Sequence, residues 1–92
     1  MADRHEVRIV PAARRQLEQL PRQVLARVRE AIRGLGMDPR PQGSRMLSEA
    51  RKIWRIRAGD YRVLYEIRDR ELVVLVIRVG HRRDVYRRAS RG

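Results

Sequence analysis

The chain has no cysteine among its 92 residues. A disulfide framework, a thiolate zinc site and a cysteine nucleophile are therefore excluded. This composition is compatible with a reducing compartment such as the cytoplasm. Any chemistry at this protein's site must come from other side chains.

Long hydrophobic runs are also missing. No stretch approaches the roughly 18 apolar residues that a membrane span needs. The first ten residues, MADRHEVRIV, are too charged and too short in their apolar run to form a signal peptide. We therefore expect a soluble, cytoplasmic protein that forms one small domain over residues 1–92.

Lysine is nearly absent, because Lys52 is the one lysine among 23 lysines and arginines. Arginine presents a planar fork of donors that holds a phosphate at two points, whereas lysine offers a point charge. A GC-rich genome would explain this ratio, but it would not explain the formal net charge of +12. Residues 1–50 carry ten cations and six anions (+4), and residues 51–92 carry thirteen cations and five anions (+8). The excess predicts a polyanionic partner that binds the C-terminal half.

The N-terminal half has the pattern of one strand and two helices. Apolar and charged residues alternate over residues 5–10, which predicts a strand. Residues 12–20 have helix-forming composition, and Pro21 suits the first turn of a second helix. Gly34 and Gly36 end the apolar face of that helix. We expect the two helices to form a tight hairpin with a buried seam.

The C-terminal half has the pattern of a loop and three strands. Prolines and a glycine predict a loop over residues 37–44. Strands are expected over residues 52–57 and 61–67, around an Ala-Gly-Asp turn, and over residues 71–79. The last of these is apolar on both faces, as is typical of a central strand. The predicted fold class is α+β, with an N-terminal strand, a helical hairpin and a three-stranded antiparallel meander.

Alternation along the strands places arginines on one face of the predicted sheet. Successive side chains of a strand point to opposite faces. The face with Trp54, Tyr61 and Tyr65 must pack on the helices, which favours core packing over base stacking for these aromatic residues. The opposite face receives Arg55, Arg57, Arg62 and Arg78. Like charges on neighbouring strands repel, so these arginines destabilise the fold, and they are better explained by binding to a row of phosphates. The alternative is a basic face that is exposed to solvent and binds no ligand.

More cationic and polar side chains follow the last predicted strand. The segment GHRRDVY places His81, Arg82, Arg83 and Tyr86 where that strand ends. Cations stabilise the charge that develops on a phosphate, and a histidine or a phenol can move a proton. This group is therefore suited to hold a phosphodiester and to cut it.

The order of these elements, with the motifs GDYRVLYEI and VGHRRDVYRR, resembles the RelE branch of the RelE/ParE toxin superfamily. The resemblance covers residues 7–88 and includes the Leu20-Pro21 link between the helices. It implies a RelE-like small sheet packed on two helices. It also implies the toxin of a type II toxin–antitoxin pair, which cuts mRNA in the A site of a translating ribosome. The implied cut uses the ribose 2′-OH as nucleophile and needs no metal ion and no cofactor.

The resemblance assigns roles to individual residues. Arg62 takes the place of the family's phosphate-stabilising arginine, and Arg82 that of the arginine proposed to serve the leaving group. Tyr86 takes the place of a tyrosine that stacks on a base or acts as general base. Arg55 is a further catalytic candidate. Contacts with RNA are expected from Arg57, Arg78, Arg83 and Lys52.

The chain departs from the family at the general base. The best-studied members carry two lysines on the strand before the turn, where this sequence has Ile53 and Arg55, with Lys52 off register. An arginine stabilises charge well but accepts a proton poorly, because its pKa is above about 12. The base is therefore expected to be His81, since imidazole titrates near neutrality, or Tyr86.

Two other functions fit the same fold. The ParE branch inhibits DNA gyrase without cutting RNA, but ParE-like chains generally lack the combination found here at Arg62, Arg82 and Tyr86. The missing lysines leave open a non-catalytic module that binds only nucleic acid or an antitoxin.

The resemblance also implies partners. The ribosome and mRNA are expected as targets, and a cognate antitoxin, often acidic in its wrapping segment, as the inhibitor. We expect that segment to cover the helical seam and the basic sheet. It should either occlude Arg62 and Arg82 or displace residues 85–89. Contact with DNA is expected only through the antitoxin.

Overall fold

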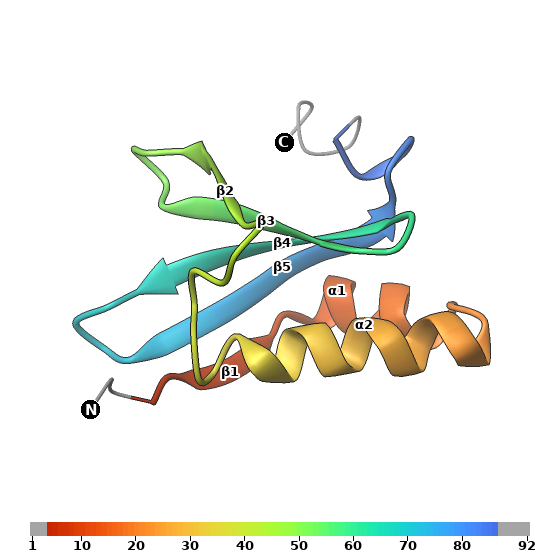
Figure 1. Ribbon diagram of the computed structural model, residues 1–92, viewed down its shortest axis with the longest axis horizontal. Coiled ribbons are helices and arrows are strands. Elements are labelled where there is room, and N and C mark those ends of the chain that lie inside the picture. Colours follow the sequence, from red (N-terminus) through yellow and green to blue (C-terminus); the bar gives the residue numbers. More distant parts are fainter. Residues whose placement is uncertain (1–3, 87–92) are drawn as a thin grey trace.

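A computed structural model describes residues 4–86 as a sheet with two helices against one of its faces (Figure 1). Within these residues, neither helix has the length and hydropathy that a membrane crossing requires. The elements in chain order are β1 (Glu6–Ile9), α1 (Pro11–Glu18), α2 (Arg22–Gly34), β2 (Arg45–Ser48), β3 (Ile53–Ala58), β4 (Tyr61–Arg68) and β5 (Val73–His81).

The sheet has five strands in the order β1-β5-β4-β3-β2. β1 pairs with β5 in parallel, and the other neighbours are antiparallel. The α+β class, the helical hairpin and the meander are thus confirmed. β5, the predicted central strand, lies inside the sheet between β1 and β4, although β4 holds the middle position of the five.

β2 is a strand that the sequence did not predict. It lies at the edge of the sheet, and three of its four residues are exposed. Its pairing with β3 is irregular between Met46 and Ser48. An edge strand with so little burial is under no pressure to alternate apolar and polar residues, so it leaves no period-2 pattern to detect.

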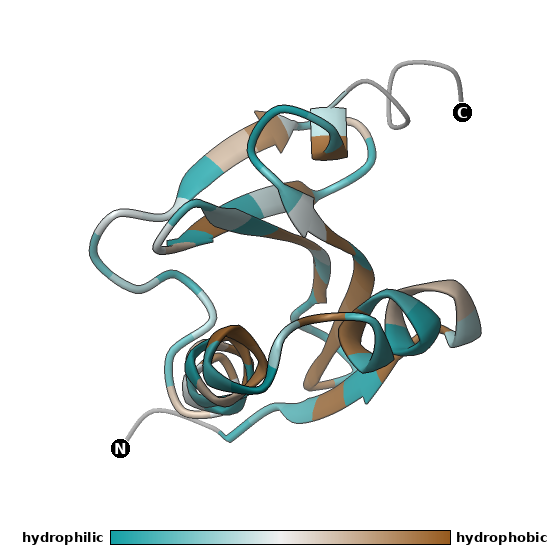
Figure 2. Ribbon diagram, turned by 90° about the vertical axis from the view of Figure 1, so that its right-hand side faces the viewer, coloured by the Kyte–Doolittle hydropathy of each residue, from teal (hydrophilic) through white to brown (hydrophobic). Residues whose placement is uncertain are grey.

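The core fills the space between the helices and the sheet. Both helices contribute apolar residues spaced for one face, such as Leu17 of α1 and Val28 of α2, and both of these are buried. Figure 2 shows hydrophobic segments in brown on the helices and on the strands that they cover. Tyr65 is fully buried, and Trp54 and Tyr61 pack against the core. The prediction that these aromatic residues belong to the core is confirmed.

Polar contacts fix the loop that leads from α2 to β2. The Tyr65 hydroxyl donates to the Pro39 carbonyl oxygen over 2.7 Å. Arg40 lies over the Trp54 ring, 5.2 Å from its centroid, and its Nη2 is 2.7 Å from Oδ2 of Asp69. The hydrogen bond from Arg40 holds the pKa of Asp69 below its ordinary value. The loop is thus tied to the middle strand and to the β4–β5 turn.

Replacement of Tyr65 by phenylalanine tests the first of these ties. Tyr65→Phe leaves the Pro39 carbonyl without its donor, so we expect a loss of about 1 kcal/mol in the free energy of unfolding at pH 7. Burial raises the pKa of Tyr65 to about 12 from 10.0. Because the folded state holds this proton more tightly, the contribution is complete below about pH 10 and is lost as the pH rises toward 12.

Thermal unfolding between pH 7 and pH 11 measures both effects. Above pH 10 the wild type should lose stability faster than Tyr65→Phe. Tyr61→Phe is the matched control, because the Tyr61 hydroxyl makes no hydrogen bond within the described part of the chain. Parallel alkaline losses in wild type and Tyr65→Phe would contradict the prediction.

Candidate active site

A two-residue turn between β3 and β4 sets the geometry of the site. Ala58 pairs with Tyr61, so only Gly59 and Asp60 lie between the strands. Gly59 has a φ of +63°, in the left-handed region that glycine adopts without steric cost. A glycine at the first central position is typical of a type II′ hairpin, whose twist matches that of the strands.

The register that follows from this turn places the predicted arginines on the face away from the helices. Arg57 pairs with Arg62, and Arg55 pairs with Leu64, so these residues alternate with the buried Ile56 and Val63. Arg78 pairs with Leu64 from the other side. It is half-buried and lines a cavity at the free edge of β5, beside α1.

The segment of residues 82–86 folds back over this open face. Figure 1 shows the segment after β5 on the side of the sheet opposite the helices. Val85 lies against Gly80, 3.5 Å from the point that a Cβ on this glycine would occupy. Val85 and Leu64 are each only 2% exposed. The sequence did not predict the burial of either residue, although Leu64 is an apolar residue at a position where parity predicts the open face.

Arg55 pairs with Leu64 and is only 8% exposed. Its Nη1 donates to the Tyr86 hydroxyl over 3.5 Å, and its Nε is buried without a hydrogen-bond partner among the described residues. A buried cationic donor without a partner costs free energy. An anionic oxygen placed beside Tyr86 would satisfy it.

Arg62 and Arg82 converge on the β3–β4 turn. Nη1 of Arg62 donates to the carbonyl oxygens of Gly59 and Tyr61, each over 3.0 Å. The backbone N–H of Arg82 donates to the Asp60 carbonyl over 2.8 Å, and its Nε lies 4.0 Å from Asp60 Oδ1. The turn therefore anchors one arginine from β4 and one from the segment after β5, and the Arg82 side chain remains 54% exposed.

His81 does not lie with these arginines. It pairs with Tyr61 and packs edge-on against the Tyr61 ring, with centroids 5.5 Å apart, so it faces the helices. Its Nδ1 accepts the backbone N–H of Arg83 over 3.2 Å, which occupies the lone pair that a general base would need. An irregularity in the pairing of β5 opposite Leu64 and Tyr65 shifts the alternation of the strand and turns His81 to this face.

The remaining predicted residues are spread more widely. Lys52 lies in the turn before β3 with a φ of 58°, at the far end of that strand from Arg57. Arg57 shares a row with Arg62, and Arg83 lies in the exposed turn after β5. Across residues 4–86, no cluster of three or more His, Asp or Glu side chains is placed to hold a metal ion.

Comparisons with known proteins agree with this fold and these motifs. Residues 7–86 match the family model described as the ParE toxin of a type II toxin–antitoxin system, parDE. The toxin RelG of Mycobacterium tuberculosis is 40% identical over 85 residues, which are 91% of this chain and 98% of that protein.

Solved structures are similar over most of the chain. The toxin–antitoxin complex RelBE2 from Mycobacterium tuberculosis matches with a TM-score of 0.74 and 36% identity, over 85% of this chain and 98% of that chain. The archaeal RelE–RelB complex from Pyrococcus horikoshii matches with a TM-score of 0.78, over 88% of this chain and 98% of that chain. At 24% identity, the second likeness supports the fold alone.

The fold and these matches define the toxin of a type II toxin–antitoxin system. The chain belongs to the RelE/ParE toxin superfamily. The resemblance drawn from the sequence motifs is thus confirmed.

Substitution of Arg55 separates its role in ligand binding from its role in folding. Arg55→Met keeps the length of the side chain and removes the buried charge with its unpaired Nε. We expect the free energy of unfolding to stay the same or to rise by about 1 kcal/mol, because apolar replacement of a buried charge is often stabilising. Stabilisation by added sulfate, measured as a shift in Tm, should decrease.

Arg57→Met is the control, since it removes the same charge from an exposed neighbour in the same strand. In Arg57→Met, the shift in Tm that sulfate produces should be closer to the wild-type shift than it is in Arg55→Met. A loss of more than about 2 kcal/mol in Arg55→Met would show that Arg55 supports the fold rather than a ligand.

Proposed function

We propose that this protein is a metal-independent endoribonuclease of the RelE type, which cuts mRNA in the A site of a translating ribosome. The observation that supports this proposal is the burial and the incomplete hydrogen bonding of Arg55 among the described residues. This cation is 8% exposed, its Nε has no hydrogen-bond partner among residues 4–86, and a tyrosine hydroxyl lies 3.5 Å from its Nη1. Such a group is suited to receive a phosphate. Arg62 lies on the same face of the sheet, and its guanidinium is held at the turn.

The proposed reaction needs charge stabilisation and two proton transfers. The ribose 2′-oxygen attacks the adjacent phosphorus, the bond from phosphorus to the 5′-oxygen breaks, and a cyclic phosphate and a free 5′-OH result. Arg55 and Arg62 would stabilise the charge on the phosphate, and Arg82 the charge on the leaving 5′-oxygen, which takes a proton from water to become the free 5′-OH. Tyr86 would take the proton of the 2′-OH or stack on a base.

The RelE type is favoured over gyrase inhibition by the nearer relatives. The family model carries the ParE name, but the relatives at 40% and 36% identity carry Rel names. The combination of Arg62, Arg82 and Tyr86 supports the same choice. Gyrase inhibition and simple binding remain the alternatives that the experiment below distinguishes.

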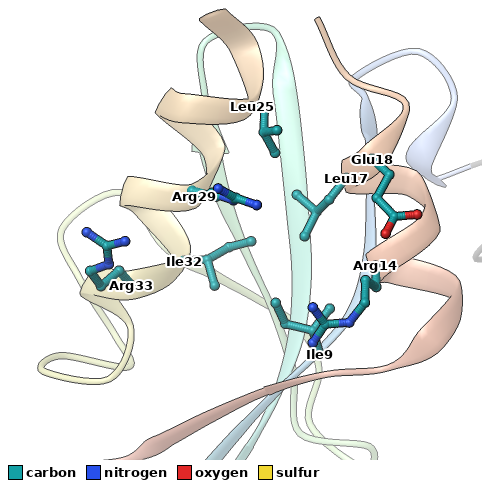
Figure 3. Close-up of a pocket in the computed structure, with 8 residues that line it drawn as sticks. All are labelled: Ile9, Arg14, Leu17, Glu18, Leu25, Arg29, Ile32 and Arg33. Atoms are coloured by element: carbon teal, nitrogen blue, oxygen red, sulfur yellow. The ribbon is translucent and has the colours of Figure 1, made fainter. Parts of the chain in front are cut away.

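We also infer that this chain binds a cognate antitoxin, as the toxin in the RelBE2 complex does. A groove of about 330 Å³ runs between α1 and α2. Figure 3 shows apolar residues lining it, with arginines from both helices and the single carboxylate of Glu18 around it. Such a groove suits an amphipathic segment with acidic residues along its polar edges. The apolar residues are Ile9, Leu17, Leu25 and Ile32, and the arginines are Arg14, Arg29 and Arg33.

The antitoxin has a second way to inhibit, at the other face. Val85 covers Gly80, so a segment that took the place of Val85 would also separate Tyr86 from Arg55. The rest of the segment expected to be displaced, residues 87–89, lies outside the described residues. A structure of the complex that left both this region and Arg62 with Arg82 uncovered would contradict this inference.

Primer extension on an mRNA in a reconstituted translation reaction tests the nuclease. We expect new 3′ ends only when ribosomes are present. Arg62→Ala should slow cleavage by roughly 10²- to 10³-fold, which corresponds to about 3–4 kcal/mol of lost transition-state stabilisation. Tyr86→Phe should also slow cleavage if the hydroxyl takes the proton, and should leave the rate near that of the wild type if the ring only stacks.

His81→Ala is the internal control, because His81 faces the helices. It should cleave at nearly the wild-type rate, and a loss as large as that of Arg62→Ala would restore His81 as the base. Intact mRNA at high toxin concentration, with gyrase trapped on DNA, would support the ParE function. Intact mRNA without trapped gyrase would support a non-catalytic protein that only binds nucleic acid or an antitoxin.

Charge reversal in the groove tests the antitoxin surface. Arg29→Glu should weaken the affinity for the cognate antitoxin at least tenfold, because it places a like charge against an acidic segment. Arg15→Glu makes the same change on α1 outside the groove and should have a much smaller effect. Isothermal titration calorimetry on the purified pair gives both values. Equal losses in the two variants would point to net charge rather than to the groove.

A further inference from the structure

Arg27 of α2 reaches the β3–β4 turn from the helix side. Its Nη1 lies 3.0 Å, and its Cδ 3.9 Å, from the point that a Cβ on Gly59 would occupy. Glycine therefore has two roles at this position: it adopts the positive φ of the turn, and it leaves room for the guanidinium of Arg27. A Cβ at this position would come into close contact with the Arg27 guanidinium, which would have to shift slightly.

A cavity of about 220 Å³ lies where α2 meets this turn. Gln23 and Arg27 line it from the helix, and residues 58–61 line it from the turn. Within residues 4–86, Arg27 makes no ion pair and no side-chain hydrogen bond. An amide and an unpaired guanidinium thus border the same space, and both can donate to an anionic oxygen.

Three arginines from separate elements meet at this one turn. Arg62 bonds to its carbonyls, Arg82 lies beside Asp60, and Arg27 lies against Gly59. Asp60 is the one carboxylate among residues 58–61, and its ion-pair partner is Arg82 at 4.0 Å. The positive charge at the hairpin tip therefore exceeds what the neighbouring side chains neutralise.

We infer that Arg27, with Gln23 beside it, forms a second phosphate-binding site for single-stranded RNA on the helix side of the hairpin tip. An RNA strand carries one phosphate per nucleotide, so a strand held at the arginines of the open face presents its next phosphates where it passes the tip. The inference rests on the proposed function. It goes beyond that function because Arg27 comes from a helix and from the other face of the sheet.

The salt dependence of RNA binding tests this site without requiring cleavage. The probe is a short oligoribonucleotide with 2′-O-methyl substitution at every position, which blocks the nucleophile and keeps an RNA strand, titrated by fluorescence anisotropy at several salt concentrations. Each phosphate contact on a single strand contributes about −0.7 to the slope of log K against log salt. Arg27→Ala should make the slope less steep by about 0.7, and Arg27→Lys should keep it close to the wild-type value.

Arg15→Ala is the matched control, because it removes an equal charge from an exposed position on α1. Its slope should equal that of the wild type, and the Tm of each variant checks that the fold is kept. An unchanged slope in Arg27→Ala, or an equal decrease in Arg15→Ala, would overturn the inference. Either result leaves the proposed nuclease standing, since cleavage is measured separately by primer extension. An absence of wild-type cleavage would count against the nuclease alone.

Discussion

The two-residue turn between β3 and β4 is the constraint on which the site depends. It fixes the register of the two strands, and a shift by one residue would exchange their two faces. The arginines of the open face would then enter the core, and Ile56 and Val63 would face solvent. The same turn supplies the carbonyls that hold Arg62 and the close approach that admits Arg27. Gly59 therefore determines both the register of the two strands and the positions of Arg62 and Arg27.

Strand periodicity was enough to predict much of this arrangement. The helices, the meander and the face of the arginines follow from alternation and from the positions of proline and glycine. The surroundings of His81 were not predicted from its motif, because its ring packs against Tyr61 on the helix side although Arg82 follows it directly in the sequence. The burial of Arg55 was also hidden, since its Nη1 contacts the hydroxyl of Tyr86, which comes 31 residues later in the sequence. Such a contact joins residues that no local pattern relates.

The site retains a charge in a place where folding alone would favour an apolar residue. Arg55 is buried beside Leu64, its Nε has no partner in the described part of the chain, and its neighbours on the open face are also cationic. Replacement of such a group by an apolar one is often neutral or stabilising in proteins. A residue that costs free energy in the free protein is best explained by what it contributes in a complex.

The cover over Arg55 must also be easy to remove. It is made by Tyr86, whose neighbour Val85 is buried outside the main core between the helices and the sheet. A segment with so few buried apolar contacts opens at a free energy well below that of global unfolding. We therefore expect the same short segment to serve two competing ligands. RNA would gain Arg55 by moving Tyr86 aside, and an antitoxin segment bound in place of Val85 would remove Tyr86 from the site. Inhibition and substrate binding would then exclude each other because they require different positions of the same residues.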